Sequence, residues 1–364
     1  MLDFGNGPTP GEVEVTLLGP GYGESVVIHA TNNFWLVVDS CVPANTQSAA
    51  AVSYLNSIGV DLANVRFVVA THWHDDHVRG LAQVVEMSPN AKLVLGAALQ
   101  QKEFMQIAAA YGSTQESSWP GASEIAKALT TIQRRTPRGM RPSVSFASAG
   151  KVLWDNAVSG VPVKIEVLSP SDADNTEAVA RFAQMLPQDR DPVRRATPGK
   201  PNHVALAMHI AVGNLHILLG SDLEKTTALD SGWDAVLSEE SRTIPMSTLY
   251  KVSHHGSITG HHEGIWNQLL HPKPLSILTP FRRGRVRLPK ETDRQRIRSL
   301  SGLAYATSLP TSGYARATPE QRQLSKRAQN VQLAVDNYGV VRARRSADGS
   351  GPWAIEKFGN ALDL

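Results

Sequence analysis

The chain has 364 residues, of which 41% are hydrophobic and 19% charged, which is ordinary for a soluble globular protein. No apolar run approaches the roughly 18 residues that span a bilayer, and the single cysteine, Cys41, excludes an intramolecular disulfide. The net charge of +3 is small for so long a chain. With no charged-then-apolar leader at the start, these features predict a cytoplasmic protein without a membrane segment.

The first part of the chain alternates short apolar runs with turns, which predicts an opening sheet. Three runs are expected to be strands of a meander: Val13–Leu18, Val26–His29 and Phe34–Val38. A helix is expected over Ala49–Ile58, ended by Gly59, and a further strand over Lys92–Leu95.

Residues 71 to 77 read Thr-His-Trp-His-Asp-Asp-His and form the most informative segment of the chain. The apolar run Val65–Ala70 before them predicts a buried strand, and residues 78 to 85 predict the start of a helix. The histidines therefore follow the carboxyl end of a strand, where α/β proteins commonly place their sites. Isolated histidines are more often surface or core residues, but three with an aspartate at this spacing favour a metal site.

The spacing of these side chains suits two metal ions. His72 and His74 are two residues apart, so they point to the same side of an extended segment. Asp76 and His77 follow after a bend and can face a second position beside the first. Imidazole nitrogen and carboxylate oxygen together suit zinc, and carboxylate ligands leave manganese as the alternative.

The middle of the chain carries fewer signals. A helical pattern runs over residues 97 to 132, with interruptions at Gly112 and at Pro120-Gly121. Residues 134 to 141 and 189 to 201 predict loops, and Val163–Leu168 a strand. A hairpin around Gly213-Asn214 is expected from the runs Val204–Val212 and Leu215–Leu219. Asp222 follows the second run, where it suits either a bridge between two ions or a helix N-cap.

The segment His72–His77 matches the pattern His-x-His-x-Asp-His in full, and in this the chain resembles the metallo-β-lactamase superfamily. Three other segments, in order and approximate spacing, are similar to strands and motifs of that family: 33–40, 218–222 and 251–257. The resemblance is closest to the lactamase-like domain of bacterial DNA-uptake channel proteins and their soluble relatives. It covers about residues 13 to 280, and it implies an αββα sandwich, a metallo-β-lactamase fold with a helical insertion.

The resemblance also implies a ligand set for two divalent ions, with Asp222 as the bridge: His72, His74, Asp76, His77, His203, Asp222 and His255. His203 stands where the family has its third histidine. It departs from the common pattern because Asn202 precedes it and Val204 follows, and in the DNA-uptake branch an asparagine occurs here. Between His254 and His255 the metal assignment stays open, and the other histidine becomes a substrate contact.

The implied chemistry is hydrolysis. Two divalent ions about 3.5–4 Å apart supply hydroxide at neutral pH and neutralise a phosphoryl group. Asp76 and Asp222 hold the ions, His254 protonates the leaving oxygen, and Asp39 orients a ligand imidazole. Lys251 is expected to be solvated, with a place near the mouth of the site as the alternative, and Cys41 to be a small buried residue rather than a catalytic thiol.

Basic residues crowd a short stretch after the last motif: Arg282, Arg283, Arg285, Arg287, Lys290, Arg294, Arg296 and Arg298. A second basic group, Arg342, Arg344 and Arg345, lies near the end of the chain. Arginines at this density suit phosphate contacts, but a solvated loop or a surface for a partner protein is an equal alternative.

We interpret residues 1–364 as a single domain with an insertion at about 97–160 and a basic C-terminal extension at about 281–364. The leading hypothesis is a phosphodiesterase or nuclease that uses metal-activated hydroxide on a nucleic acid or nucleotide. The alternatives are a hydrolase of a small lactone or thioester, and a non-catalytic metal-containing module that acts with a partner protein. The oligomeric state stays open.

Overall fold

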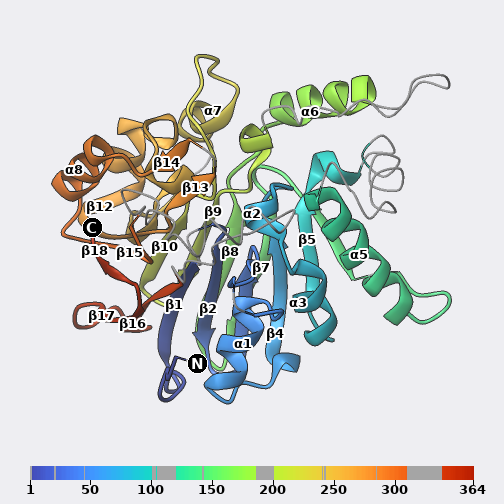
Figure 1. The fold of residues 1–364 in the computed structure, drawn as a ribbon, viewed down its shortest axis with the longest axis horizontal. Coiled ribbons are helices and arrows are strands. Elements are labelled where there is room, and N and C mark those ends of the chain that lie inside the picture. Colours follow the sequence, from blue (N-terminus) through green and yellow to red (C-terminus); the bar gives the residue numbers. More distant parts are fainter. Residues whose placement is uncertain are drawn as a thin grey trace, which may run out of the picture.

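A computed structural model of the protein describes most of the chain (Figure 1). The described residues are 2–19, 22–44, 46–100, 104, 120–141, 143–185, 201–239, 241, 243–283, 285–309 and 338–364. The loop predicted over 189–201 lies almost wholly outside them, as does Gly112 in the predicted helical stretch.

The first sheet has eight strands in the order β17-β16-β1-β2-β3-β4-β5-β6. Their bounds are β1 Glu12–Gly19, β2 Ser25–Thr31, β3 Phe34–Val38, β4 Val65–Ala70, β5 Lys92–Gly96, β6 Val144–Ala147, β16 Gly339–Ser346 and β17 Ala354–Gly359. The strands from β3 to β6 run parallel, whereas β17, β16, β1, β2 and β3 are joined by antiparallel pairing. The parallel strands are nearly continuous in apolar residues because helices or the other sheet cover both of their faces.

The second sheet repeats this plan in the order β18-β15-β12-β11-β10-β9-β8-β7. Its strands are β7 Val152–Val158, β8 Val161–Val167, β9 Met208–Val212, β10 Leu215–Leu219, β11 Ser247–Lys251, β12 Leu270–Leu278, β15 Leu303–Ala306 and β18 Leu362–Asp363. Strands β10, β11, β12 and β15 run parallel. A separate two-stranded hairpin, β13 Phe281–Arg283 and β14 Val286–Leu288, follows β12.

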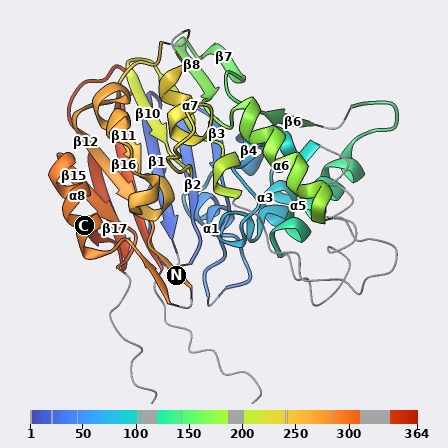
Figure 2. The same cartoon turned by 90° about the horizontal axis from the view of Figure 1, so that it is seen from above.

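The two sheets pack face to face, and helices cover the outer face of each. The apolar core between the sheets includes Val15, Ile28, Ile165, Ile210 and Ile217. A second core lies under α1 Ala50–Ser57, α3 Leu81–Met87 and α5 Pro120–Arg135, outside the first sheet. A third lies under α7 Gly232–Ser238 and α8 Glu291–Leu300, outside the second. The predicted αββα sandwich is therefore confirmed, and α6 Asp172–Met185 lies at one end of it (Figure 2).

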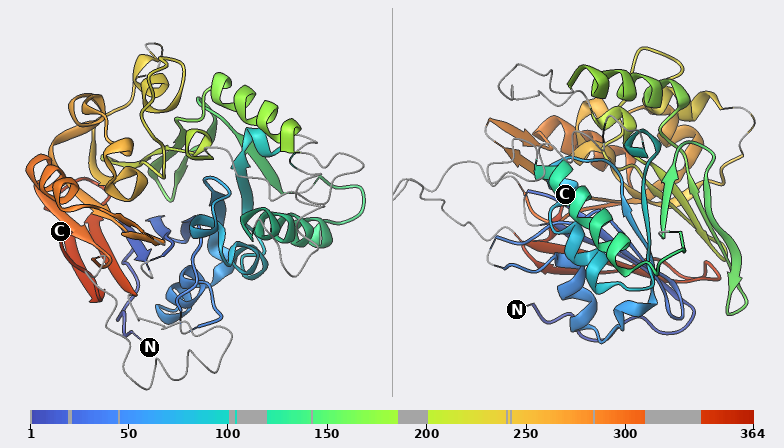
Figure 3. Two further views of the ribbon diagram at one scale, coloured as in Figure 1. Left: turned by 45° about the horizontal axis from the view of Figure 1, so that its top comes forward. Right: turned by 90° about the vertical axis from the view of Figure 1, so that its right-hand side faces the viewer.

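The last part of the chain completes both sheets. Strand β16 pairs with β1 in antiparallel register from Glu12–Ser346 to Gly19–Gly339, so the blue and red strands lie side by side (Figure 3). Strands β15 and β18 extend the second sheet beyond β12. Within the proposed insertion, β6 is the edge strand of the first sheet at the end away from β17. Strand β7 is the edge strand of the second sheet at the end away from β18. The domain boundaries proposed from the sequence stay a prediction.

Two local predictions are corrected by the structure. The helix expected from residue 78 is broken into α2 Asp75–Val78 and α3, because Arg79 is extended and Gly80 has a φ of 82°, so neither continues the helical path. The strand expected from Val204 begins only at Met208, and residues 201 to 204 form a 3₁₀ turn, η3. Among the described residues, no helix is both long and apolar enough to cross a membrane.

Candidate metal centre

The candidate site lies where the parallel strands of both sheets end. From the first sheet, Asp39 follows β3 and the segment from Thr71 to His77 follows β4. From the second, Asp222 lies three residues after β10 and His255 lies four residues after β11. Because the carboxyl ends of the parallel strands meet at one end of the sandwich, the two halves of the chain supply one site.

The side chains at this end of the sandwich form two groups that share one carboxylate. In the first group, ligand atoms of His72, His74 and Asp222 all lie within 4.8 Å of one another. In the second group, the same limit holds for Asp76, His77, Asp222 and His255. Asp222 thus occupies the position that a bridge between two ions requires. Its alternative role as a helix N-cap is excluded, because the next helix, α7, begins only at Gly232.

Polar atoms of the second group are buried but lack hydrogen-bond partners. The Nε2 atoms of His77 and His255 and the Oδ1 atom of Asp222 are in this state. His77 Nε2 lies 3.3 Å from Asp222 Oδ1, and His255 Nε2 lies 3.3 Å from Asp76 Oδ2. These atoms face oppositely charged neighbours without forming well-directed hydrogen bonds, so the set suits a ligand that all of them contact at once. Imidazole and carboxylate donors in this arrangement fit a divalent ion such as zinc.

The charges around the site are strongly coupled. Burial lowers the pKa of His77, but the carboxylates of Asp222, Asp39 and Asp76 outweigh it and raise this pKa well above its usual value. Burial likewise lowers the pKa of His255, but the nearby carboxylates, chiefly Asp222, outweigh it and raise this pKa to about 10. Burial raises the pKa of Asp222, yet His255 and His77 hold it well below its usual range. Because a histidine must be deprotonated to bind a metal, the affinity of this group for a divalent ion should fall as the pH is lowered.

Asp39 supports the second group from behind, as the sequence predicts. Its Oδ2 atom lies 2.7 Å from His77 Nδ1, which fixes the orientation of the ring. The same carboxylate accepts hydrogen bonds from the Thr71 amide and hydroxyl, each at 2.8 Å. The His77 Nε2 atom is consequently turned towards Asp222. This carboxylate–imidazole pair is the usual way in which proteins orient a metal-binding histidine.

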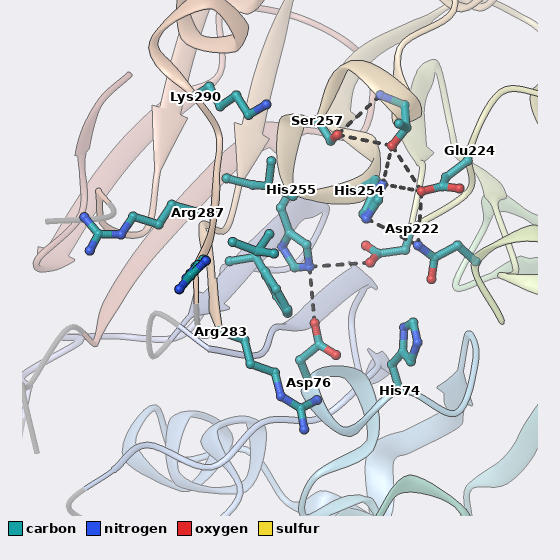
Figure 4. A pocket seen from close by; sticks show the side chains of 16 residues that line it. His74, Asp76, Asp222, Glu224, His254, His255, Ser257, Arg283, Arg287 and Lys290 are labelled. Atoms are coloured by element: carbon teal, nitrogen blue, oxygen red, sulfur yellow. Dashed lines mark hydrogen bonds and ion pairs between the residues drawn. The ribbon is translucent and has the colours of Figure 1, made fainter. Parts of the chain in front are cut away.

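Adjacent histidines after β11 have different surroundings. Both His254 and His255 adopt left-handed backbone conformations, with φ of 46° and 50°. His255 points into the second group, whereas the Nδ1 atom of His254 lies 2.8 Å from Glu224 Oε1 (Figure 4). Burial raises the pKa of Glu224, but hydrogen bonds from His203 and His254 lower it overall. This geometry favours His255 as the ligand and leaves His254 at the cavity wall, although both roles stay predictions.

The third-histidine position differs most from the sequence expectation. His203 lies in η3 with its Nε2 atom 3.6 Å from Glu224 Oε2, and it does not join His72 and His74 within the described structure. Asn202 lines the cavity instead, and its Oδ1 atom is buried without a hydrogen-bond partner. The assignment of His203 as a ligand therefore stays a prediction that the side-chain geometry does not favour.

Three residues that contribute to the site carried no clear signal in the sequence. Glu24 and Glu224 are isolated acidic residues that no spacing rule connects with the histidines. Lys251 was expected to be solvated, and this is wrong, since its side chain is 1% exposed and pairs with Glu24. Lysine is rarely buried unless paired, so residue type argued for solvent, whereas its place at the start of the segment 251–257 was the signal that put it near the site.

The site opens into a cavity of about 690 Å³ whose far wall is the β13–β14 hairpin. Its charged and polar lining includes side chains of both groups, together with Glu224, His254, Arg283, Arg285, Arg287 and Lys290. Figure 4 shows Arg283, Arg287 and Lys290 on the hairpin side and Asp76, Asp222 and His255 at the centre. Phe281, Val286 and Leu288 form an apolar part of the same wall.

Comparison with known proteins supports the fold. A sequence model of the metallo-β-lactamase superfamily matches residues 18–97, which include the motif from His72 to His77. No curated protein sequence matches the chain significantly. The matched segment and the αββα layers identify a metallo-β-lactamase fold, and this fold with its histidine and aspartate groups suggests a metal-dependent hydrolase.

Solved structures of the same fold are similar to the chain at low identity. The metallo-β-lactamase fold protein YhfI from Bacillus subtilis is 12% identical, with a TM-score of 0.42, over 83% of this chain and 98% of its own. A metallo-β-lactamase from Cronobacter sakazakii is 15% identical, with a TM-score of 0.31, over 57% and 60% of the two chains. The dizinc quorum-quenching lactonase AidC is 15% identical, with a TM-score of 0.31, over 55% of each chain.

Proposed function

We propose that this protein is a metal-dependent phosphodiesterase that acts on a nucleic acid or a nucleotide. The observation that carries the proposal is the position of the β13–β14 hairpin, which brings Arg283, Arg285 and Arg287 into the same cavity as the two ligand groups. Arginine forks bind phosphate oxygens bidentately, so they can hold phosphates that flank the one at the metal centre.

The charge of the cavity favours an anionic substrate. Four basic side chains line it (Arg283, Arg285, Arg287 and Lys290) against three acidic ones (Asp76, Asp222 and Glu224). Two of these acidic side chains belong to the ligand groups, and divalent ions there would make the cavity more positive still. With ions bound at the ligand groups, the positive charge would exceed the negative, and such a cavity attracts anionic ligands.

Five other arginines of the two basic groups have acidic partners in the structure. On α8, Arg294 and Arg298 pair with Glu291, and Arg296 pairs with Asp293. Arg342 pairs with Glu356 with a side chain only 2% exposed, and Arg344 pairs with Glu14. The hypothesis that the group near the end of the chain contacts phosphates is therefore not supported, and the hairpin remains the phosphate-binding candidate.

The cavity provides the groups that hydrolysis needs. His72, His74 and Asp222 would hold one ion, and Asp76, His77, Asp222 and His255 the other. When bound, two ions lower the pKa of a shared water and neutralise charge on the phosphoryl oxygens. His254 lies at the cavity wall with Glu224 Oε1 2.8 Å from its Nδ1 atom and the Asn202 amide nitrogen 3.3 Å from its Nε2 atom. For His254 to protonate the leaving oxygen, the substrate must take the place of the Asn202 amide at Nε2. The side chains of His72, Asp76, His77, Asp222 and His255 are all buried, which limits the contact of water with the centre.

One observation favours a second candidate, a hydrolase of a small lactone or thioester. Phe281, Val286 and Leu288 give the cavity an apolar wall that an acyl chain could contact.

The relation to the lactamase-like domains of DNA-uptake channel proteins also stays a proposal. It is supported by the segment Lys251–Ser257 and by Asn202 at the third-histidine position.

A substrate comparison separates the two candidates. We expect metal-loaded protein to hydrolyse bis-p-nitrophenyl phosphate and to cleave DNA or a dinucleotide, with little turnover of lactone or thioester substrates. Faster hydrolysis of a lactone or thioester than of any phosphodiester, in the same metal-loaded preparation, would reject the phosphodiesterase in favour of the second candidate.

A further inference from the structure

Two buried side chains outside the ligand groups connect the two sheets beneath the metal centre. Glu24 directly precedes β2 of the first sheet, and Lys251 ends β11 of the second. Each side chain is 1% exposed, and the Lys251 ammonium forms an ion pair with Glu24 Oε1. Burial of such a pair carries a desolvation cost. The pair therefore contributes little to stability unless further hydrogen bonds to both charged groups offset that cost.

The Glu24 carboxylate reaches both imidazoles of the second group from behind. Its Oε1 atom lies 3.7 Å from His77 Nδ1, and its Oε2 atom lies 3.7 Å from His255 Nδ1. The Thr279 hydroxyl donates a hydrogen bond to Oε2, and the His255 Nδ1 atom lies 3.1 Å from the Thr279 carbonyl oxygen. Glu24 thus lies behind both rings and attracts their Nδ1 atoms electrostatically, while Asp39 and the Thr279 carbonyl make the hydrogen-bond contacts that orient His77 and His255.

The Lys251 ammonium holds the turn that presents the bridging carboxylate. Its Nζ atom donates to the carbonyl oxygen of Ser221 at 3.2 Å, directly before Asp222. Ser221 has a φ of 46°, so this turn is in a backbone conformation that few residues adopt without support. The same carbonyl accepts a 2.9 Å hydrogen bond from the His254 amide.

The backbone around Glu24 is fitted closely to the motif. Glu24 N donates to the carbonyl oxygen of Asp76 at 2.9 Å. Gly23 has a φ of 105°, and a Cβ atom there would lie 3.0 Å from that same oxygen and 3.0 Å from the Cys41 Cβ atom. A residue with a side chain would therefore push Glu24 away from the centre.

We infer that the Glu24–Lys251 pair positions the side chains of the second group for metal binding. The inference rests on the proposed function, because it concerns the ligands proposed there. Glu24, Asp39 and His77 also form a group that has the composition of a metal site. The Lys251 ammonium already supplies a positive charge beside Glu24, so this group does not need a third metal ion. The pair instead positions the neighbouring ligand side chains.

The test measures zinc binding to Lys251→Met and to Lys251→Met/Glu24→Gln with a competing chelator. The double variant has the same net charge as the wild type, so it isolates positioning from simple electrostatics. We expect the affinity for one of the two ions to fall by about 10–100-fold in the double variant, as for other residues that orient metal ligands. The affinity for the other ion should change little. Lys225→Met, at an exposed lysine, changes the charge as Lys251→Met does and is the control for that variant. It should bind zinc as the wild type does.

Thermal unfolding of the metal-free proteins distinguishes positioning from a structural role. Lys251→Met leaves the Glu24 carboxylate buried without its partner and should destabilise the fold, whereas the double variant should recover stability but not metal affinity. Wild-type affinity for both ions in the double variant would overturn the inference while leaving the proposed function intact. A wild-type protein that binds no ion would overturn both.

Discussion

Asp222→Asn is expected to lower phosphodiester turnover by roughly three orders of magnitude or more, because this carboxylate belongs to both ligand groups. The amide keeps the size of the side chain but loses the charge, and it can offer only one oxygen where two are needed. Metal content and turnover should therefore fall together. The measurement is the initial rate with bis-p-nitrophenyl phosphate, alongside elemental analysis of the same sample.

A carboxylate outside the cavity provides the control for Asp222→Asn. Asp155 is exposed on β7, and Asp155→Asn changes the charge equally without touching the site. We expect its metal content and rate to match those of the wild type. If Asp222→Asn retained both ions and at least a tenth of the rate in a folded protein, Asp222 would not be the bridge.

Replacing Arg283, Arg285 and Arg287 with alanine is expected to weaken nucleic-acid binding by orders of magnitude at low salt. The slope of log affinity against log salt should become shallower by roughly 0.7–0.9 for each phosphate that the variant no longer neutralises. Hydrolysis of bis-p-nitrophenyl phosphate should persist, because this small substrate needs only the centre and the ligand groups are unchanged. Arg282 is left in place because it does not line the cavity.

A triple variant of equal charge change separates a specific interaction from net charge. Arg134, Arg138 and Arg141 lie on or after the end of α5 and do not line the cavity. Their replacement with alanine should change affinity and salt slope far less than the hairpin variant does. Equal effects of the two triple variants would show that the hairpin does not bind phosphates specifically, and would favour the lactone or thioester hydrolase.

Much of the first sheet and the motif could be predicted because their signals are local. Val65–Ala70 is an apolar run that forms β4 with the same bounds, and the histidines follow its end as expected. The strand Phe34–Val38 is likewise matched residue for residue by β3, which places Asp39 at the site. In each case neighbours in the sequence are also neighbours in space, so periodicity and residue type carry enough information.

The features that could not be predicted depend on interactions between distant segments. Nothing in Gly339–Ser346 indicates that it pairs with β1, because its arginines suggest a surface strand while Glu14 and Glu356 supply the compensating charges. Lys251 is buried only because Glu24, far away in sequence, lies opposite it. For the hairpin arginines, the sequence indicated a place close after His255 and a phosphate contact, but not the pairing of β12 with β11 that brings them to the cavity.

The central claim is that one chain holds two divalent ions at the shared carboxylate of Asp222. Elemental analysis of protein purified without chelator, and again after reconstitution with zinc or manganese, tests it most directly. The account predicts about two ions per chain in the wild type and a clearly lower metal content in Asp222→Asn. A metal content near zero after reconstitution of folded wild-type protein would contradict it.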